Sequence, residues 1–293
     1  MKTSNIVLTL AYSLEDGIGR MNKLHYYFNK WFGIQNDPKL LSSKQIWYGR
    51  VNTWKNLKAT EKEILRCAKD GVAGYMIEMA GDYPNNPEAW KDPWLKDIEE
   101  KYKKVVKMCR TAGLWLFVSI VNDNMGQGKY GDTSPKLEKV LIMAQNLATI
   151  IKKNGTSNVI VQPVAETQTN GGRIFEKYCR NELCNFPLVY NGSGGFPSGT
   201  GGFNYRAVHP STTTTVCPED ALVISDHSKI IRELALLGSF NASINPGKAH
   251  IWADTVFNKS KCRVMGYYAF QRVEYDKDTI SVLGEIAKSY ENR

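Results

Sequence analysis

Apolar residues recur every three to four positions in several stretches of the chain, the spacing of a helix that buries one face. In the clearest stretch, Ser134-Pro135 supplies an N-cap and a first-turn proline, and Asn154-Gly155 ends the helix. Its apolar stripe comprises Leu137, Val140, Leu141, Ala144, Leu147, Ala148 and Ile151. Similar spacing predicts helices starting at a capping box, Thr60-x-x-Glu63, and over about 98–109, 172–183, 228–237, 247–258 and 278–290.

Short apolar runs separate these helices. The runs are rich in β-branched and aromatic residues and apolar on both faces, as expected of parallel strands covered by helices. They span residues 5–12, 72–80, 114–121, 158–165, 186–191, 204–209, 221–226 and 263–270. Eight strands alternating with helices in 293 residues predict an α/β fold of the (β/α)8 or TIM-barrel type. A doubly wound sheet is the main alternative, but SLEDGIGRMN after the first run lacks its Gly-rich phosphate turn.

The same pattern predicts a single domain over residues 1–293, since no linker or internal repeat divides the chain. A long early segment at about 17–58 and a glycine-rich loop at 192–202 interrupt the alternation. Because long βα loops line barrel sites, we expect both segments to shape a cleft.

Composition narrows the class of protein. With 42% hydrophobic and 23% charged residues, the chain is neither disordered, collagenous nor a coiled coil. The N-terminus lacks the features of a secretion signal, and no apolar run reaches the ~20 residues that span a bilayer. We therefore expect no membrane partner and a location in the cytoplasm or in a larger particle. Cys67, Cys109 and Cys179 fall on apolar helix faces, which predicts buried thiols in a reducing compartment.

The formal net charge is +9, which raises the question of an anionic partner. The lysines and arginines are spread along the chain, and no basic run is interleaved with aromatic residues as in nucleic-acid motifs. We therefore expect no specific nucleic-acid partner. A negatively charged polymeric substrate explains the surplus equally well.

Carboxylate, amide or imidazole side chains follow seven of the eight predicted strands. Because the carboxyl ends of barrel strands meet at one rim, these side chains predict a polar functional pocket. The candidates are Glu78, Asp82, Asn122, Asp123, Glu166, Gln168, Asn191, His209, Asp226, His227 and Gln271. Aromatic residues in the connections, among them Trp47, Trp54 and Trp94, could stack on sugar faces, so the combination favours a carbohydrate.

The layout resembles the large clan of retaining (β/α)8 glycoside hydrolases, in which an acid/base Glu ends strand four and a nucleophilic carboxylate ends strand seven. The resemblance implies that Glu166 is the general acid/base and that Asp226 is the nucleophile or base. His209 lies near a position that the clan often fills with His or Tyr, and Tyr268 lies at the usual place of an aromatic. Two positions depart from the clan: it has Asn-Glu where this chain has Ala165-Glu166, and Glu where this chain has Asp226.

Glycoside hydrolysis needs two carboxyl groups that flank one glycosidic bond, one protonated and one ionised. Glu166 follows a mostly apolar run, which raises a carboxyl pKa and suits the acid. Asp226, beside His227 and near Lys229, suits the ionised role, and Glu78 is a reserve candidate.

Two alternatives remain on the sequence alone. A metal-dependent barrel isomerase or hydrolase would use Glu166, Asp226, His209 and His227 as ligands, although the chain has only four histidines and no HExxH motif. A non-catalytic barrel would bind carbohydrate at the same rim without cleaving it. Our expectation is a glycosidase that needs no metal or other cofactor.

Overall fold

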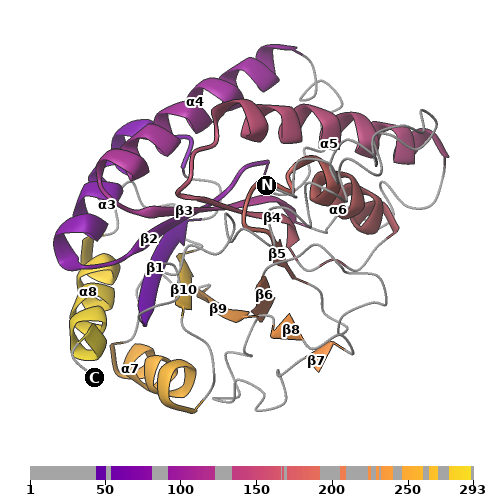
Figure 1. Cartoon of the computed structure of the whole chain (residues 1–293). Helices are drawn as coiled ribbons and strands as arrows, with labels where there is room; N and C mark the ends of the chain where they lie inside the picture. Colours follow the sequence, from indigo (N-terminus) through magenta and orange to yellow (C-terminus); the bar gives the residue numbers. More distant parts are fainter. Residues whose placement is uncertain are drawn as a thin grey trace, which may run out of the picture.

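Strands and helices alternate from residue 45 to residue 190 in the computed structural model (Figure 1). The structure describes residues 44–50, 54–80, 92–122, 134–165, 167, 170–191, 205–208, 224–225, 229–230, 232–239, 246–259, 264–269 and 277–291. The strands are β1 (Gln45–Arg50), β2 (Gly74–Glu78), β3 (Trp115–Asn122), β4 (Val159–Ala165), β5 (Val189–Tyr190), β6 (Tyr205–Val208), β7 (Ile224–Ser225), β8 (Lys229–Ile230), β9 (Arg232–Ser239) and β10 (Val264–Ala269). The helices are α3 (Leu57–Asp70), α4 (Asp92–Thr111), α5 (Ser134–Asn154), α6 (Asn170–Glu182), α7 (Pro246–Asp254) and α8 (Lys277–Glu291), with a π-helical turn η3 (Thr255–Lys259) after α7.

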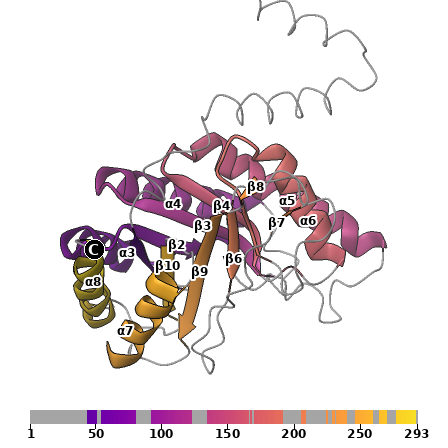
Figure 2. The ribbon, with the colours of Figure 1, turned by 60° about the horizontal axis from the view of Figure 1, so that its bottom comes forward.

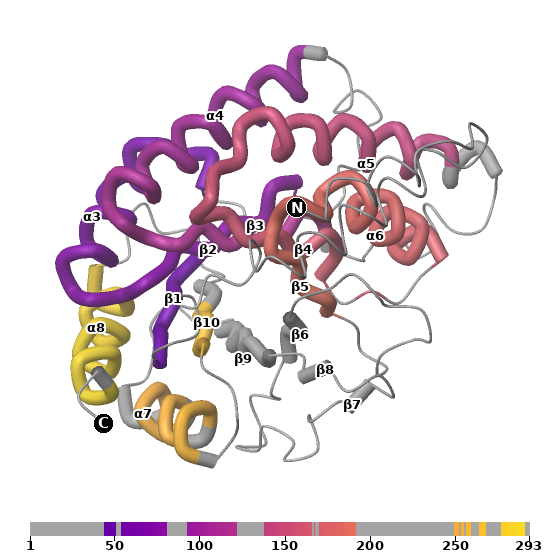
Figure 3. Tube along the Cα trace, in the orientation of Figure 1, coloured from indigo at the N-terminus to yellow at the C-terminus, as the bar shows by residue number. Residues whose placement is uncertain are grey.

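Eight strands form one curled parallel sheet in the order β4-β3-β2-β1-β10-β9-β6-β5. The first and last described strands, β1 and β10, are neighbours (Figure 3). At the two ends of the order, Val161 of β4 forms a parallel bridge with Leu188, just before β5. Helices α3, α4, α5 and α6 cover the outer side of the sheet (Figure 2). This sheet confirms the predicted α/β fold, in which helices cover parallel strands.

The first strand of the sheet is not where the sequence pattern placed it. The predicted strand at 5–12 lies outside the described residues, whereas Gln45–Arg50 forms β1 inside the segment expected to be a loop. That expectation is wrong for residues 45–50. The strand was missed because polar residues occupy both ends and Gly49 its interior, yet all six residues are buried.

The seventh strand also differs from the prediction. Of the predicted strand at 221–226, residues Ile224–Ser225 pair antiparallel with Lys229–Ile230 in a separate two-stranded sheet. The helix expected at 228–237 is wrong, because Arg232–Ser239 forms β9 between β6 and β10. The segment RELALLGS favours a helix locally, but such preferences differ by only about 1 kcal/mol per residue. A strand with a parallel neighbour on each side pairs its backbone groups along both edges, and this pairing overrides the local preference.

Most predicted helices are confirmed. Helix α5 runs from Ser134 to Asn154 as the pattern indicated, although Leu141 of its predicted stripe is exposed. The capping box is wrong: α3 begins at Leu57, and the side chain of its N-cap, Asn56, accepts a hydrogen bond from Ala59 N at 3.3 Å. Thr60 instead donates its hydroxyl to the carbonyl oxygen of Trp54 at 3.0 Å.

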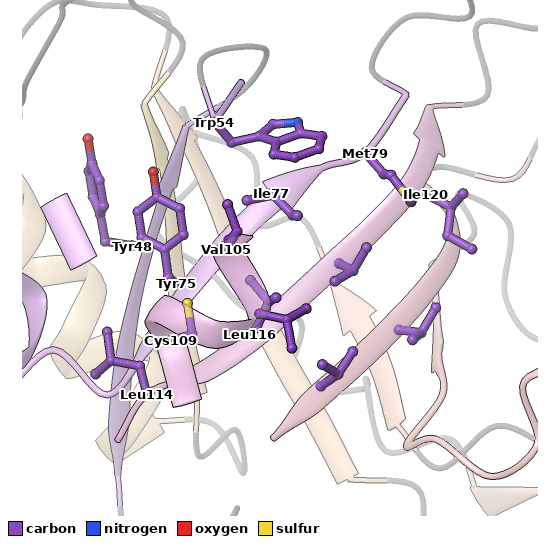
Figure 4. Packing of buried hydrophobic residues seen from close by; sticks show 14 of the residues in the cluster. Tyr48, Trp54, Tyr75, Ile77, Met79, Val105, Cys109, Leu114, Leu116 and Ile120 are labelled. Carbon is purple, nitrogen blue, oxygen red and sulfur yellow. The ribbon is translucent and has the colours of Figure 1, made fainter. Parts of the chain in front are cut away.

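The core has two parts because successive strand residues point to opposite sides of the sheet. On the outer side, strand residues such as Tyr75 and Leu116 pack against helix residues such as Val105 and Cys109 (Figure 4). On the inner side, six residues form a smaller apolar cluster, here called the apolar plug: Trp47, Met76, Phe117, Ile160, Val189 and Val264.

The predicted buried thiols are confirmed: Cys67, Cys109 and Cys179 are buried and form no disulfide bond. Among the described residues, no helix has the length and apolar character needed to cross a membrane. The described ranges also bring no three His, Cys, Asp or Glu side chains together in an arrangement that could hold a metal ion.

Candidate active site

A layer of polar side chains covers the apolar plug on β2, β3 and β4 and directly after β5. On each strand, a plug residue is followed two positions later by a polar residue, which therefore points to the same inner side. The pairs are Met76 and Glu78, Phe117 and Ser119, Ile160 and Gln162, and Val189 and Asn191. The step from apolar to polar runs toward the carboxyl ends of the strands, where barrel enzymes bind their substrates. We call Glu78, Ser119, Gln162 and Asn191 the polar layer.

Hydrogen bonds join three members of the polar layer across β3, β4 and the end of β5. Gln162 Nε2 donates to Ser119 Oγ at 3.0 Å, and Asn191 Nδ2 donates to Gln162 Oε1 at 3.2 Å. Glu78, Ser119 and Gln162 are also direct neighbours in the strand register. At 7% exposure or less, these groups need such partners, because a buried polar atom without one is costly.

Two members of this layer were not predicted. Ser119 and Gln162 lie inside the apolar runs LWLFVSIV and VIVQPVA, whereas the predicted site residues lie near the end of each run or after it. A polar residue that interrupts a buried strand is the signal that could have identified them.

The chain next to Glu166 is held on both sides. Glu166 itself lies outside the described residues, but Ala165 ends β4 in register with Asn122 of β3. On the other side, Thr167 N donates to the carbonyl oxygen of Asn191 at 2.8 Å, and Thr167 Oγ1 donates to Glu176 Oε2 of α6 at 2.9 Å. Thr167 and Glu176 are both buried.

Glu78 is a predicted site residue that the structure brings into the polar layer, as the last residue of β2. Its carbonyl oxygen accepts a hydrogen bond from Trp54 Nε1 at 2.5 Å. Trp54 and Trp47 are fully buried, so neither ring is available to stack on a sugar, contrary to the sequence expectation.

A lysine follows Trp54 in the connection between β1 and α3. The Lys55 ammonium lies 5.8 Å from the centroid of the Trp94 ring, a cation–π arrangement. Burial lowers the pKa of Lys55, Lys101 lowers it further, and Asp97 opposes both effects. Asp97 is itself paired with Lys101 at 2.8 Å, so these three side chains together carry one net positive charge.

Asn191, another predicted residue, belongs to the polar layer and lies directly after β5. Of the remaining predicted residues, Asn122 is the last residue of β3 and Tyr268 lies in β10. The other candidates lie outside the described residues: Asp82, Asp123, Glu166, Gln168, His209, Asp226, His227 and Gln271. The premise for Asp226 is wrong, because the seventh strand of the sheet in chain order is β9, which ends at Ser239. The following residues, FNASIN, contain no carboxylate.

A second buried cluster lies on the outer side of the sheet. Arg50 Nη2 pairs with Glu63 Oε1 of α3 at 2.5 Å, and the Tyr75 hydroxyl donates to Glu63 Oε2 at 2.7 Å. Burial, followed by the charge of Glu63, raises the pKa of Tyr75 well above its usual value. The cluster ties β1 and β2 to α3, which is a structural role.

Comparisons with known proteins address the fold. No protein-family model and no curated protein matches the sequence. Among solved structures, the chain is similar to the endo-β-1,4-mannanase of Thermotoga petrophila, with a TM-score of 0.56, 10% identity, and coverage of 85% of this chain and 77% of that one. A family 5 glycoside hydrolase from Bacteroides vulgatus gives a TM-score of 0.56 and 8% identity over 80% of this chain, which spans 61% of that enzyme's length.

The homocysteine methyltransferase of Escherichia coli is also similar, with a TM-score of 0.50, 12% identity, and coverage of 85% of this chain and 96% of that one. At such identities the similarity concerns the fold, and one fold carries different reactions. The resemblance to barrel glycoside hydrolases is therefore confirmed for the fold.

Proposed function

We propose that the protein is a glycoside hydrolase on a single, complete (β/α)8 barrel and that it cleaves a glycosidic bond in an oligo- or polysaccharide. The observation that carries the proposal is the polar layer, which covers the apolar plug beside the segment that bears Glu166. Similarity to a mannanase and to other glycoside hydrolases supports this choice of chemistry. The bridge between Val161 and Leu188 supports closure of the barrel, because it joins the two ends of the strand order.

Glu166 is the proposed general acid. It directly follows β4, at the carboxyl end of the strand, where barrel enzymes place their catalytic residues. A protonated carboxyl group can then donate to the leaving glycosidic oxygen.

Glu78 is the proposed second carboxylate, from its inward position in the polar layer, and Asp226, which the sequence analysis named, is the alternative. Through Ser119, Glu78 lies in register with Gln162 of β4, three residues before that strand ends at Ala165. A second carboxylate that acts as the nucleophile gives retention at the anomeric carbon, and one that activates water gives inversion.

The proposed substrate is a carbohydrate, and an anionic one. One mannanase in the comparison was solved with maltose, and a bifidobacterial enzyme with Manβ1-4GlcNAc. The net positive charge of Lys55, Asp97 and Lys101 together, with the net charge of +9 of the chain, favours a glycan that carries carboxylates or sulfates. The proposed substrate contacts are Glu78, Asp82, Asn122, Asp123, Gln168, Asn191, His209, His227, Tyr268 and Gln271.

A hydrolysis screen tests this function. The purified protein is incubated with neutral and acidic polysaccharides, with and without EDTA, and new reducing ends are measured. We expect release of reducing ends from at least one acidic glycan, unchanged by EDTA. Loss of activity in EDTA that added metal restores would support the metal-dependent alternative, and binding without cleavage would support the carbohydrate-binding alternative.

A further inference from the structure

Thr167, the residue after Glu166, is fixed by its backbone and by its side chain at once. Its N–H donates to the carbonyl oxygen of Asn191 at the end of β5, and its hydroxyl donates to Glu176 of α6. The chain at Thr167 is therefore attached both to the neighbouring strand and to the helix that follows β4.

Asn191 continues this attachment into the barrel. The carbonyl oxygen of Asn191 accepts from Thr167 N, while its side chain donates to Gln162, which in turn donates to Ser119. Asn191 is 2% exposed and Gln162 and Ser119 are 1% exposed, so water does not compete for these bonds. A continuous chain of hydrogen bonds thus runs from the inner face of β3 to the residue beside Glu166.

We propose that Thr167 and Asn191 are positioning residues for Glu166, an inference that rests on the proposed function. Each residue has two soft backbone torsions, so fixing Ala165 in the sheet and Thr167 at two points restricts the main chain between them. A catalytic carboxyl group must be held within about 0.5 Å of its productive geometry. Displacing it by about 1 Å can reduce the rate about 100-fold.

The hydroxyl of Thr167 offers a matched pair of variants. Thr167→Val keeps the branched shape but removes the donor to Glu176, whereas Thr167→Ser keeps the donor. We expect Thr167→Val to lower kcat about 10-fold to 100-fold with KM within about threefold of the parent, and to shift the limb of the pH–rate profile that reports the acid. Thr167→Ser should stay within about threefold of the parent in kcat, because it can donate the same hydrogen bond. A Thr167→Val protein with the parent's kcat and pH profile would overturn the proposal.

Amide hydrogen exchange separates this proposal from the proposed function, because it needs no substrate. Exchange at residues 166–169 should be about tenfold faster in Thr167→Val than in the parent or Thr167→Ser, with the amides of β4 unchanged. If the parent hydrolyses no glycan, the proposed function is wrong, but the exchange rates still test whether the hydrogen bonds of Thr167 restrict this part of the chain. Equal exchange in all three proteins would overturn the attachment itself. Should Thr167→Val fail to fold, Glu176→Leu removes the same hydrogen bond from α6, with the same expected outcome.

Discussion

The side-chain amide of Asn191 donates a hydrogen bond to Gln162 Oε1 at 3.2 Å, on the inner side of the sheet directly above the apolar plug. Neither residue belongs to a turn or to the surface, and both are buried. A sheet with a purely apolar interior would need no amides there. Their pairing marks the level at which the inner side of the sheet changes from the apolar plug to the polar layer.

Replacing Gln162 with leucine should destabilise the protein. Gln162→Leu is similar in size but leaves Asn191 Nδ2 without its acceptor and Ser119 Oγ without its donor. We expect the free energy of unfolding to fall by about 1 to 3 kcal/mol, as for other buried polar groups that lose a partner. Urea denaturation measures this change, and Gln145→Leu on the exposed side of α5 is the matched control. Equal stability of the two variants would contradict the structural role of the amide pair.

The stability of the protein at high pH should depend on Tyr75. Folding raises the pKa of Tyr75 above its usual value. Tyr75 therefore contributes its full stabilisation below a pH of about 10, where the phenol keeps its proton in both the folded and the unfolded chain. This stabilisation is lost as the pH rises further, because the unfolded chain loses the proton first. Tyr75→Phe removes the hydrogen bond to Glu63 and should cost about 1.5 to 3 kcal/mol at pH 8. The difference between parent and variant should shrink above pH 10 by up to ~1.4 kcal/mol per pH unit. Denaturation curves from pH 8 to 11 test this, and a constant difference would refute it.

Lys55 should discriminate between acidic and neutral glycans. Lys55→Met keeps most of the side-chain stem but removes the charge over Trp94. We expect KM for an acidic glycan to rise about threefold to tenfold at low salt, the size of a partly exposed charge interaction, and the effect to weaken as salt is added. Steady-state kinetics on acidic and neutral substrates measure it, with Lys139→Met on the exposed side of α5 as control. An equal change on both substrates would argue against recognition of an anion.

Matched substitutions should identify the second carboxylate. If Glu78 fills this role, Glu78→Gln lowers kcat at least about 100-fold, whereas Asp226→Asn stays within about threefold of the parent. Steady-state kinetics measure both, and proton NMR of the first product formed shows whether the carboxylate acts as nucleophile, with retention, or as base, with inversion. Loss of activity in Asp226→Asn rather than in Glu78→Gln would assign the role to Asp226.

The sequence predicted those parts of the fold in which local pattern and tertiary environment agree. The runs around β2, β3 and β4 are apolar on both faces because helices cover one side of the sheet and the apolar plug lies on the other. Helix α5 was predicted with its bounds because Ser134-Pro135 starts it and Asn154-Gly155 ends it. β1 was missed because it is short and polar at both ends, and β9 because its composition favours a helix. In both strands, pairing with neighbours far away in the sequence decides the structure.

The candidate site was predictable to a similar extent. Glu78 and Asn191 were identified because barrel strands end at one rim, a rule that depends on topology alone. Ser119 and Gln162 were missed because nothing in their local sequence shows that they pair with each other across strands. The premise for Asp226 failed with the strand assignment on which it depended.

The central claim is that Glu166 supplies the proton for glycosidic cleavage, and the turnover of Glu166→Gln tests it most directly. The glutamine keeps the size and polarity of the side chain but cannot act as an acid. On a glycan that the parent cleaves, we predict that kcat falls at least about 100-fold while the Kd measured by calorimetry changes less than about threefold. Hydrolysis by Glu166→Gln at the rate of the parent would contradict the claim.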